Sequence, residues 1–341
     1  MIFFVVVIMT VAALAAHPAE AARKKKRAAA RQPDRFAQIV IDASTGYVLS
    51  EKNADKRLHP ASLTKMMTLY LAFDALDNGK LSRNDYIYVS RRAARQEPSS
   101  LGLEEGDRIR AEDAILGIAT KSANDASVAL AEELGGSEWE FARMMTEKAR
   151  GLGMRNTNFV NASGLHNPSQ YSSARDMAIL SQALLRDHPD YYRYFSTGAF
   201  TYRGNTYINH NKLMNSYRGM DGIKTGYVYA SGYNLAASAA RGGVRLIGVI
   251  FGGNTSKSRN EAMRKLLDDG FVAMANTDPA ALAGAAARNV AAEAPAAASF
   301  EQPTGIRASQ LGAQGLSASD QGDADIGDET RTVRIHQGHV P

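Results

Sequence analysis

Three short sequence patterns combine side chains that can carry out acyl transfer. They are Ser62-Leu63-Thr64-Lys65, Ser122-Ala123-Asn124 and Lys224-Thr225-Gly226. On a helix, residues three apart share a face, so Lys65 can reach the Ser62 hydroxyl. A lysine accepts a proton only as a neutral amine, and burial together with a second cation, here Lys224, lowers a lysine pKa. Ser62 and Lys65 are therefore a candidate nucleophile and general base.

The other two patterns supply further groups that acyl transfer requires. Ser122 could pass a proton to a leaving amine, and Asn124 could orient the base and a substrate amide. Lys224 and Thr225 could hold a carboxylate, Gly226 would allow close backbone approach, and a strand edge there could bind an extended peptide. Taken singly, each pattern also fits an ordinary helix cap or an exposed lysine.

The surrounding residues predict the elements that position these patterns. An N-terminal hairpin is expected from the β-rich runs FAQIVID and YVL on either side of a turn cluster at 43–46. Ser62 lies at the start of a helix that ends at Gly79. Apolar spacing predicts further helices at about 111–119, 124–134, 137–150 and 173–187.

After Lys212 the pattern changes from helices to strands. YNLAASAA and VRLIGVIF flank Arg241-Gly242-Gly243, which predicts a tight hairpin, and a closing helix follows in SRNEAMRKLLDDGFVAMA. Strands at both ends and helices between them predict an α+β fold, with an antiparallel sheet flanked by helices and a separate helical lobe. Ser122 would then lie between two helices and Lys224 on a strand.

The two ends of the chain differ in composition from the region between them. Residues 1–21 resemble a signal peptide, because an apolar run too short to span a membrane precedes the small-x-small site Ala19-Glu20-Ala21. No Lys or Arg precedes that run, so an uncleaved anchor stays the alternative. Residues 22–34 are expected to be a basic linker and residues 35–276 the catalytic domain. Residues 277–341 are expected to be a low-complexity, disordered tail, with possible transient helix in its alanine-rich part.

Composition excludes several classes of chemistry. The chain has 341 residues and no cysteine, so thiolate nucleophiles, disulfides and zinc–cysteine sites are impossible. Much of its formal charge of +5 lies in the run 23–27, and no basic face with interleaved aromatics suggests nucleic-acid binding. The seven histidines show no metal-ligand spacing. We therefore expect neither a metal nor an organic cofactor.

Longer stretches carry a family resemblance from about Phe36 to Ala275. They are HPASLTKMMT, KSANDASVALAE, GMRNTNFVNASGLHNPSQYSSARDMA, MDGIKTG and SGYNLAASAARGGVRLIGVIFGG. These stretches resemble the low-molecular-mass penicillin-binding proteins, specifically the serine D-Ala-D-Ala carboxypeptidases of the peptidase S11 family. The resemblance implies a β-lactamase/DD-peptidase-like fold and an exported enzyme that acts in the periplasm or cell envelope.

The resemblance also implies roles for individual residues. Ser62 would attack the carbonyl between two D-alanines of a peptidoglycan stem peptide, Lys65 would act as base, and Ser122 would protonate the departing D-alanine. Water would then cleave the acyl-enzyme, and β-lactams would acylate the same serine. The oxyanion would meet the backbone N–H groups of Ser62 and Tyr227. The substrate would be bound by Asn124, Lys224, Thr225, Gly226, Tyr227 and Arg259. Arg259 could instead be a helix-surface arginine.

The sequence departs from the family pattern in two places. Tyr227 stands where a smaller or imidazole side chain is common. Residues 277–341 are too polar for the family's β-rich C-terminal domain and membrane helix, so no clear membrane anchor is expected.

Three alternative functions remain. A class A β-lactamase would carry a Glu-x-x-Leu-Asn pattern between Ser122 and Lys224, and that pattern is absent. A D,D-endopeptidase would use the same motifs, so they do not decide. A catalytically inert wall-binding module would have no reason to keep all three.

Overall fold

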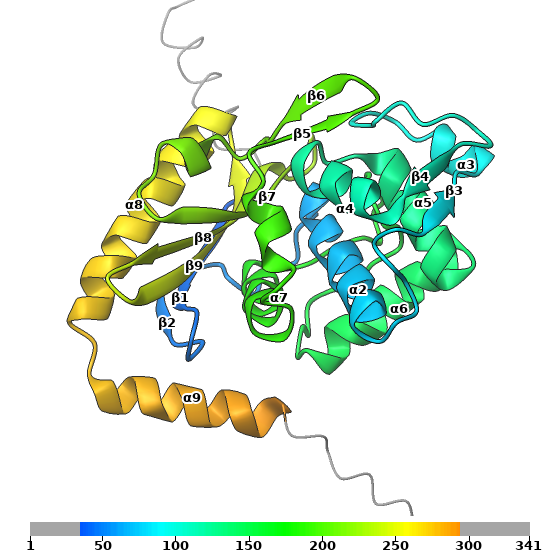
Figure 1. Cartoon of the computed structure of the whole chain (residues 1–341). Coiled ribbons are helices and arrows are strands. Elements are labelled where there is room, and N and C mark those ends of the chain that lie inside the picture. The colour runs from blue at the N-terminus through cyan, green and yellow to red at the C-terminus, as the bar shows by residue number, and fades with distance from the viewer. Residues whose placement is uncertain (1–34, 294–341) are drawn as a thin grey trace, which may run out of the picture. The chain divides into compact units, whose positions relative to one another are not determined.

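The strands that pair into the main sheet come from both ends of the described chain. The computed structural model describes residues 35–293. Its five-stranded sheet has the order β2-β1-β9-β8-β7, with every pair antiparallel. The strands are β1 (Ala37–Asp42), β2 (Val48–Lys52), β7 (Met220–Val228), β8 (Gly232–Arg241) and β9 (Val244–Gly253). This order leaves β7, which carries Lys224 to Gly226, at an edge of the sheet (Figure 1).

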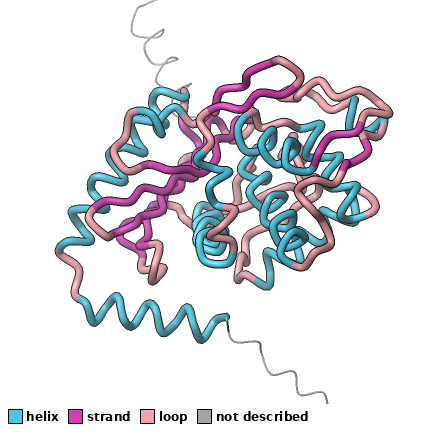
Figure 2. Tube along the Cα trace, in the orientation of Figure 1, coloured by secondary structure: helices cyan, strands magenta, loops and turns pink. Residues whose placement is uncertain are grey.

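Helices cover both faces of this sheet because both faces of its central strands are apolar. Alternate residues of β1 belong to different core clusters: Ile39 packs in one and Val40 in the other. Helix α8 (Ser256–Ala275) packs on one face through Met263 and Leu267, and α7 (Ala174–Asp187) packs on the other (Figures 1 and 2). Two-sided burial makes the strands near-continuous hydrophobic runs.

The predicted β8–β9 hairpin is confirmed in detail. Its two-residue turn consists of Gly242 and Gly243, which have φ of 56° and 82°. A two-residue turn with positive φ at both positions matches the twist of the flanking strands. The N-terminal hairpin is confirmed as well, with a register shift at Val40 and Ile41.

A helical lobe stands beside the sheet. It contains α2 (Lys65–Asp77), α3 (Arg91–Ala94), α4 (Ala111–Thr120), α5 (Asn124–Gly135) and α6 (Glu138–Gly151). Helix α2 is buried on nearly every side, with Met66, Leu69 and Phe73 fully inaccessible. A helix that is apolar all round belongs in the middle of a core. The expected α+β architecture with a separate helical lobe is therefore confirmed.

Several short elements were not predicted from the sequence. Two small hairpins pair β3 (Tyr86–Tyr88) with β4 (Arg108–Arg110) and β5 (Ala199–Tyr202) with β6 (Asn205–Ile208). Three 3₁₀ turns also occur: η1 (Ala61–Thr64), η2 (Tyr192–Ser196) and η3 (Lys212–Asn215). Strands of three or four residues carry too little alternation to be recognised in a sequence.

The predicted terminal segments lie largely outside the described residues. This applies to the signal peptide (1–21), the basic linker (22–34) and the tail from 294 onward. Within 277–341, where we expected disorder with transient helix in the alanine-rich part, the structure has the regular helix α9 (Pro279–Glu293). Its alanine-rich sequence explains the difference, because alanine has the highest helix propensity. No helix in the described part of the chain is both long and apolar enough to cross a membrane.

Candidate active site

Ser62 lies in the 3₁₀ turn η1, directly ahead of α2, rather than in a regular α-helical turn. Ala61 before it has φ of 51°, a conformation that side-chain-bearing residues rarely adopt. The N-cap residues of η1 and α2 are Pro60 and Thr64, so Ser62 is neither, and no side chain caps either element. The simple capping explanation for Ser62 is therefore not supported. Its hydroxyl oxygen instead lies 3.3 Å from Lys65 Nζ.

Two glycines let other segments press against the backbone of this turn. A Cβ atom on Gly226 of β7 would lie 3.0 Å from both Pro60 O and Ser62 N. A Cβ atom on Gly164, which has φ of 83°, would lie only 1.9 Å from Ala61 O. A side chain at Gly164 would collide with this backbone, and one at Gly226 would crowd it, so both glycines allow close approach to the turn that carries Ser62.

A buried asparagine ties the residues before Ser62 to the sheet. Asn234 of β8 is fully inaccessible, and its Nδ2 donates to His59 O at 3.1 Å and Pro60 O at 3.2 Å. Its Oδ1 accepts from Gly252 N at 3.2 Å. Since buried backbone carbonyls need donors, this side chain fixes where the turn leaves the sheet.

Lys65 is fully inaccessible and contacts three oxygen atoms. Its Nζ donates to Asn124 Oδ1 at 2.6 Å and to the backbone carbonyl of Ser163, and lies 3.3 Å from Ser62 Oγ. A neutral amine has two N–H groups and one lone pair. With both N–H groups directed at Asn124 and Ser163, the lone pair is left for the Ser62 hydroxyl proton. This is the geometry that a general base requires.

The electrostatic surroundings favour the neutral amine. Burial, followed by the charge of Lys224, holds the pKa of Lys65 well below its usual range, while Asp125 acts in the opposite direction. Burial and the Arg259 guanidinium lower the pKa of Lys224 to about 7. Both effects disfavour a positive charge. Lys224 is thus close enough to Lys65 for its charge to disfavour the Lys65 ammonium, which is the effect that the sequence led us to expect.

Ser122 and Asn124 join α4 to α5, as expected. Ser122 has φ of 62°, and its buried Oγ has no hydrogen-bond partner among the described residues. Asn124 is held on both sides, with Nδ2 donating to Glu97 O at 2.7 Å and its backbone N–H to Ser99 O at 2.7 Å. A buried hydroxyl without a partner requires an explanation. A substrate group that accepts or donates a hydrogen bond there would provide one.

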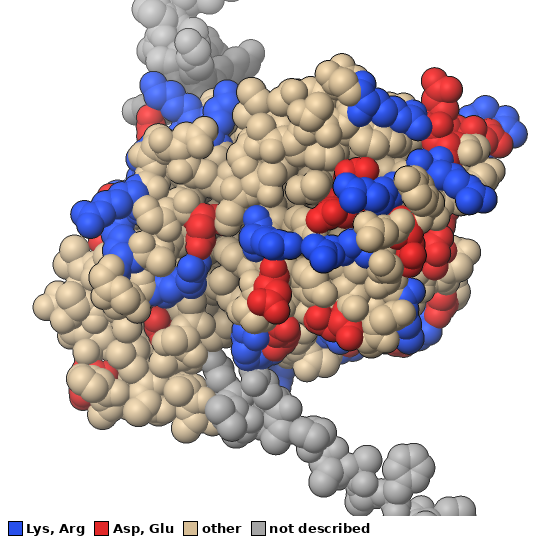
Figure 3. Space-filling view, viewed as in Figure 1, with Lys and Arg blue, Asp and Glu red and all other residues tan. Residues whose placement is uncertain are grey.

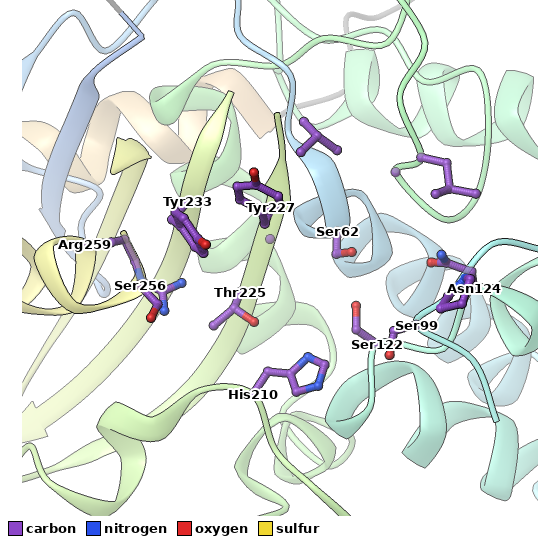
Figure 4. A pocket seen from close by; sticks show the side chains of 15 residues that line it. Ser62, Ser99, Ser122, Asn124, His210, Thr225, Tyr227, Tyr233, Ser256 and Arg259 are labelled. Carbon is purple, nitrogen blue, oxygen red and sulfur yellow. The ribbon is translucent and has the colours of Figure 1, made fainter. Parts of the chain in front are cut away.

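These side chains surround one pocket of about 300 Å³ (Figure 4). The Ser62 and Ser122 hydroxyls face the same hollow, and Thr225 and Tyr227 on β7 lie across from Ser122 and Asn124. Lys65 and Lys224 are 0% and 2% exposed and lie behind the lining rather than in it. The lining residues are Ser62, Pro98, Ser99, Ser122, Asn124, Gly164, Leu165, His210, Thr225, Gly226, Tyr227, Val228, Tyr233, Ser256 and Arg259.

Arg259 occupies the far end of the pocket rather than the helix surface. It is 4% exposed, and its Nη1 donates to Asn234 O at 2.7 Å. Burial lowers its pKa to about 10. The alternative of a solvated helix arginine is therefore wrong, and the guanidinium is the main positive group that lines the pocket.

Several residues that belong to this site were not predicted from the sequence. Ser163 contributes only a backbone carbonyl, which no residue type reveals. Gly164 lay within the Asn-Ala-Ser-Gly turn cluster, which was a usable signal for a close approach. His210 and Ser256 line the pocket from segments that carried no motif, and Tyr233 lies in a stretch quoted for the family resemblance without being singled out.

Charges on the rest of the surface are mixed in sign. On the face shown in Figure 3, Lys and Arg alternate with Asp and Glu over the helical lobe. Within residues 35–293, no group of three or more His, Asp or Glu side chains is placed to hold a metal ion.

The fold and the pocket together place a serine hydroxyl beside a buried lysine amine, at the boundary between an antiparallel sheet and a helical lobe. The chain belongs to the peptidase S11 family, whose model, described as D-alanyl-D-alanine carboxypeptidase, matches residues 24–255. The D-alanyl-D-alanine carboxypeptidase DacF of Bacillus subtilis is 43% identical over 238 residues, 68% of this chain and 61% of the relative. DacA of Escherichia coli K12, which has the same enzyme name, is 42% identical over 247 residues, 70% of this chain and 61% of the relative.

Solved structures agree with these relatives. Penicillin-binding protein 5 of Haemophilus influenzae superposes with a TM-score of 0.67 at 38% identity, over 69% of this chain and 70% of that one. Ampicillin-bound penicillin-binding protein D2 of Listeria monocytogenes superposes with a TM-score of 0.64 at 33% identity, over 70% of this chain and all of that one. The chain spans about three fifths of the length of the curated relatives named above.

Proposed function

We propose that this protein is a serine D,D-carboxypeptidase that removes the terminal D-alanine from peptidoglycan stem peptides. The observation that carries the proposal is the buried Lys65 amine, which lies 3.3 Å from Ser62 Oγ and has a lowered pKa. The membership of the chain in the peptidase S11 family and the enzyme names of its relatives support the substrate assignment.

Acylation follows from the arrangement of the pocket. Lys65 takes the Ser62 hydroxyl proton while Oγ attacks the carbonyl carbon of the penultimate D-alanine. The backbone N–H groups of Ser62 and Tyr227 stabilise the oxyanion that forms. The C–N bond then breaks, and Ser122 delivers the proton that the departing amino group requires. Ser122 takes up in turn the proton that Lys65 received from Ser62, so Lys65 is a neutral amine again before deacylation. Arg259 and Thr225 bind the terminal carboxylate, with Lys224 adding positive charge behind the strand.

Deacylation uses the same groups in reverse. Water gives a proton to Lys65 and attacks the ester, and the Ser62 oxygen recovers a proton as it leaves. A β-lactam would acylate Ser62 in the same way, as the ampicillin-bound Listeria relative suggests. No Asp or Glu lines the described pocket, so it lacks the carboxylate base with which class A β-lactamases activate a deacylating water. We therefore expect β-lactams to inhibit the protein rather than to be turned over rapidly.

We further propose that the protein acts in the cell envelope after export. The N-terminal apolar run and the Ala19-Glu20-Ala21 site support this location. N-terminal sequencing of the protein recovered from the periplasmic fraction tests it. Recovery of the full-length chain from the cytoplasm alone would contradict it.

The activity is tested by incubating the purified protein with a stem pentapeptide and, separately, with cross-linked muropeptide dimers. Release of free D-alanine from the pentapeptide, absent in Ser62→Ala, is the expected result. Release of monomers from the dimer without action on pentapeptide would identify a D,D-endopeptidase instead. Fluorescent penicillin should label the wild type with a one-to-one stoichiometry and leave Ser62→Ala dark. No labelling of a folded wild type would exclude the proposal and indicate an inert module.

A further inference from the structure

The Ser163 carbonyl has a specific part in the proposed chemistry, because it occupies one N–H of Lys65. If this oxygen moved away, the second N–H could turn toward Ser62 and the lone pair would point elsewhere. The position of this oxygen depends on the residues that fix the backbone at Ala162 and Ser163, both of which are buried.

Some hydrogen bonds within the 160–170 segment give it its shape. Gln170 Oε1 accepts from Val160 N at 2.9 Å and from Asn161 N at 3.0 Å. Asn161 Oδ1 accepts from Gly164 N at 2.7 Å. These contacts connect the segment with itself. They set its curvature, and Gln170 also ties the segment to the residue before Lys65, since its Nε2 donates to Thr64 Oγ1 at 3.2 Å.

Two contacts to other elements are made at Ala162, the residue directly before Ser163. Thr68, one turn after Lys65 on α2, donates through Oγ1 to Ala162 O at 2.7 Å. On the opposite side, Glu138 Oε1 at the start of α6 accepts from Ala162 N at 3.1 Å. Ala162 is thus hydrogen-bonded through both its carbonyl and its N–H. The next carbonyl along the chain, that of Ser163, accepts from Lys65.

Glu138 is unusual for a glutamate at a helix start. It is 4% exposed, and its other oxygen accepts from Arg92 Nε at 2.8 Å. It does not cap its own helix, since Ser137 does so by accepting from Glu140 N at 3.1 Å. Burying a carboxylate is costly unless it is paired and hydrogen-bonded. Both of its oxygens are engaged, one with the segment and one with Arg92.

We propose that Glu138 is a positioning residue for the general base: by holding the Ala162 N–H, it keeps the Ser163 carbonyl on Lys65 and so directs the Lys65 lone pair at Ser62. The inference rests on the proposed function, in which Lys65 is the base. It assigns a role in catalysis to a residue of the helical lobe that does not line the pocket containing Ser62.

If Glu138 had a purely structural role, a different one of its contacts would be important. In that case the ion pair with Arg92 would matter, and the acceptor for Ala162 would not. Glu138→Gln and Arg92→Met each abolish the ion pair but leave an oxygen for the Ala162 N–H. Glu138→Ala abolishes both. Glu140→Ala, on the exposed side of the same helix start, is the matched control for loss of a carboxylate.

The experiment measures the rate constant of acylation by fluorescent penicillin as a function of pH, together with the apparent affinity of the encounter complex. Rates are expressed per titrated active site, so an unfolded fraction does not contribute. Glu138→Ala should acylate at least tenfold more slowly with little change in affinity. The reason is that misplacing a catalytic group by about 1 Å can slow a reaction about a hundredfold. Glu138→Gln, Arg92→Met and Glu140→Ala keep an acceptor for the Ala162 N–H, so they should stay within about threefold of the wild type.

The pH profile adds a readout that lost stability alone would not move. Without the Ser163 carbonyl, the Lys65 ammonium loses an acceptor, so the acid limb of Glu138→Ala should move to lower pH. Lys224 and Asp125, the charges that act on Lys65, are unchanged in every variant. Equal slowing of Glu138→Ala, Glu138→Gln and Arg92→Met, or an unmoved acid limb, would overturn the inference alone. A wild type that penicillin does not acylate would overturn the proposed function and this inference with it.

Discussion

Replacing Gly226 by alanine tests whether the contact between β7 and the nucleophile turn builds the oxyanion site. The new Cβ would lie 3.0 Å from Pro60 O and Ser62 N and 3.2 Å from Ala61 Cβ. Non-bonded carbon contacts are most favourable at about 3.5–4.0 Å, so β7 and the turn must separate by roughly 0.5 Å. Gly226 does not have a positive φ, so backbone strain does not contribute.

The magnitude follows from what moves with the strand. Tyr227 N–H retreats from the oxyanion while Ser62 N–H stays, so one of two donors is weakened. Removing one such donor outright costs about 10²–10³ in rate. A weakened donor should therefore slow acylation about 10–100-fold, which corresponds to about 1.4–2.7 kcal/mol of activation free energy. Overpacking should also lower the free energy of unfolding by about 1–3 kcal/mol.

The assay is acylation by fluorescent penicillin, with rates expressed per titrated active site. Gly151→Ala is the matched control, because its Cβ would have no neighbour within 4 Å and its φ is not positive. It should acylate like the wild type. A folded Gly226→Ala protein that acylates at the wild-type rate would refute the reasoning, since the strand would then have no part in setting the donor geometry.

Three further predictions concern charge and backbone support. Lys224→Met removes a charge that lowers the pKa of Lys65, so the acid limb of the acylation rate should move to higher pH, and an unmoved limb would contradict this. Burial opposes the charged form of His188, but the carboxylates of Asp74 and Asp77, 3.3 Å and 2.8 Å from its ring nitrogens, outweigh burial and raise its pKa above 6.5. The stability that protonated His188 contributes is thus present below pH 6.5 and is lost as pH rises through the raised pKa. His188→Gln should therefore lower the free energy of unfolding, measured in urea, by more at pH 5.5 than at pH 8.5. Equal losses at the two pH values would contradict this. Asn234→Leu removes the side-chain donor to the His59 carbonyl and the acceptor for the Gly252 N–H, so it should lower the free energy of unfolding by about 1–3 kcal/mol and slow acylation. Urea denaturation and penicillin labelling would show the two effects. Unchanged stability would mean that water replaces the amide.

Much of the fold could be predicted because its elements are long and their apolar residues are regularly spaced. Helices α4 to α8 lie within a few residues of the predicted ranges, and the glycine pair at 242–243 marked the turn between the two central strands. The missed hairpins and 3₁₀ turns are too short to show a period. Ser62 belongs to such a turn, so the helix start was located correctly but its local geometry was not.

The amino-acid sequence by itself determined which side chains are available for chemistry: a serine and a lysine three residues apart, a second serine with an asparagine, and a lysine before a glycine on a strand. It also determined the elements that carry them, through apolar spacing and turn residues. Only the tertiary structure decided that Lys65 is a buried amine, that Ser163 contributes a carbonyl, and that Gly164 and Gly226 press on the nucleophile turn. These properties arise from packing between distant segments. Burial, a lowered pKa and the direction of a backbone carbonyl depend on what surrounds an atom, and no local pattern of residue types specifies that.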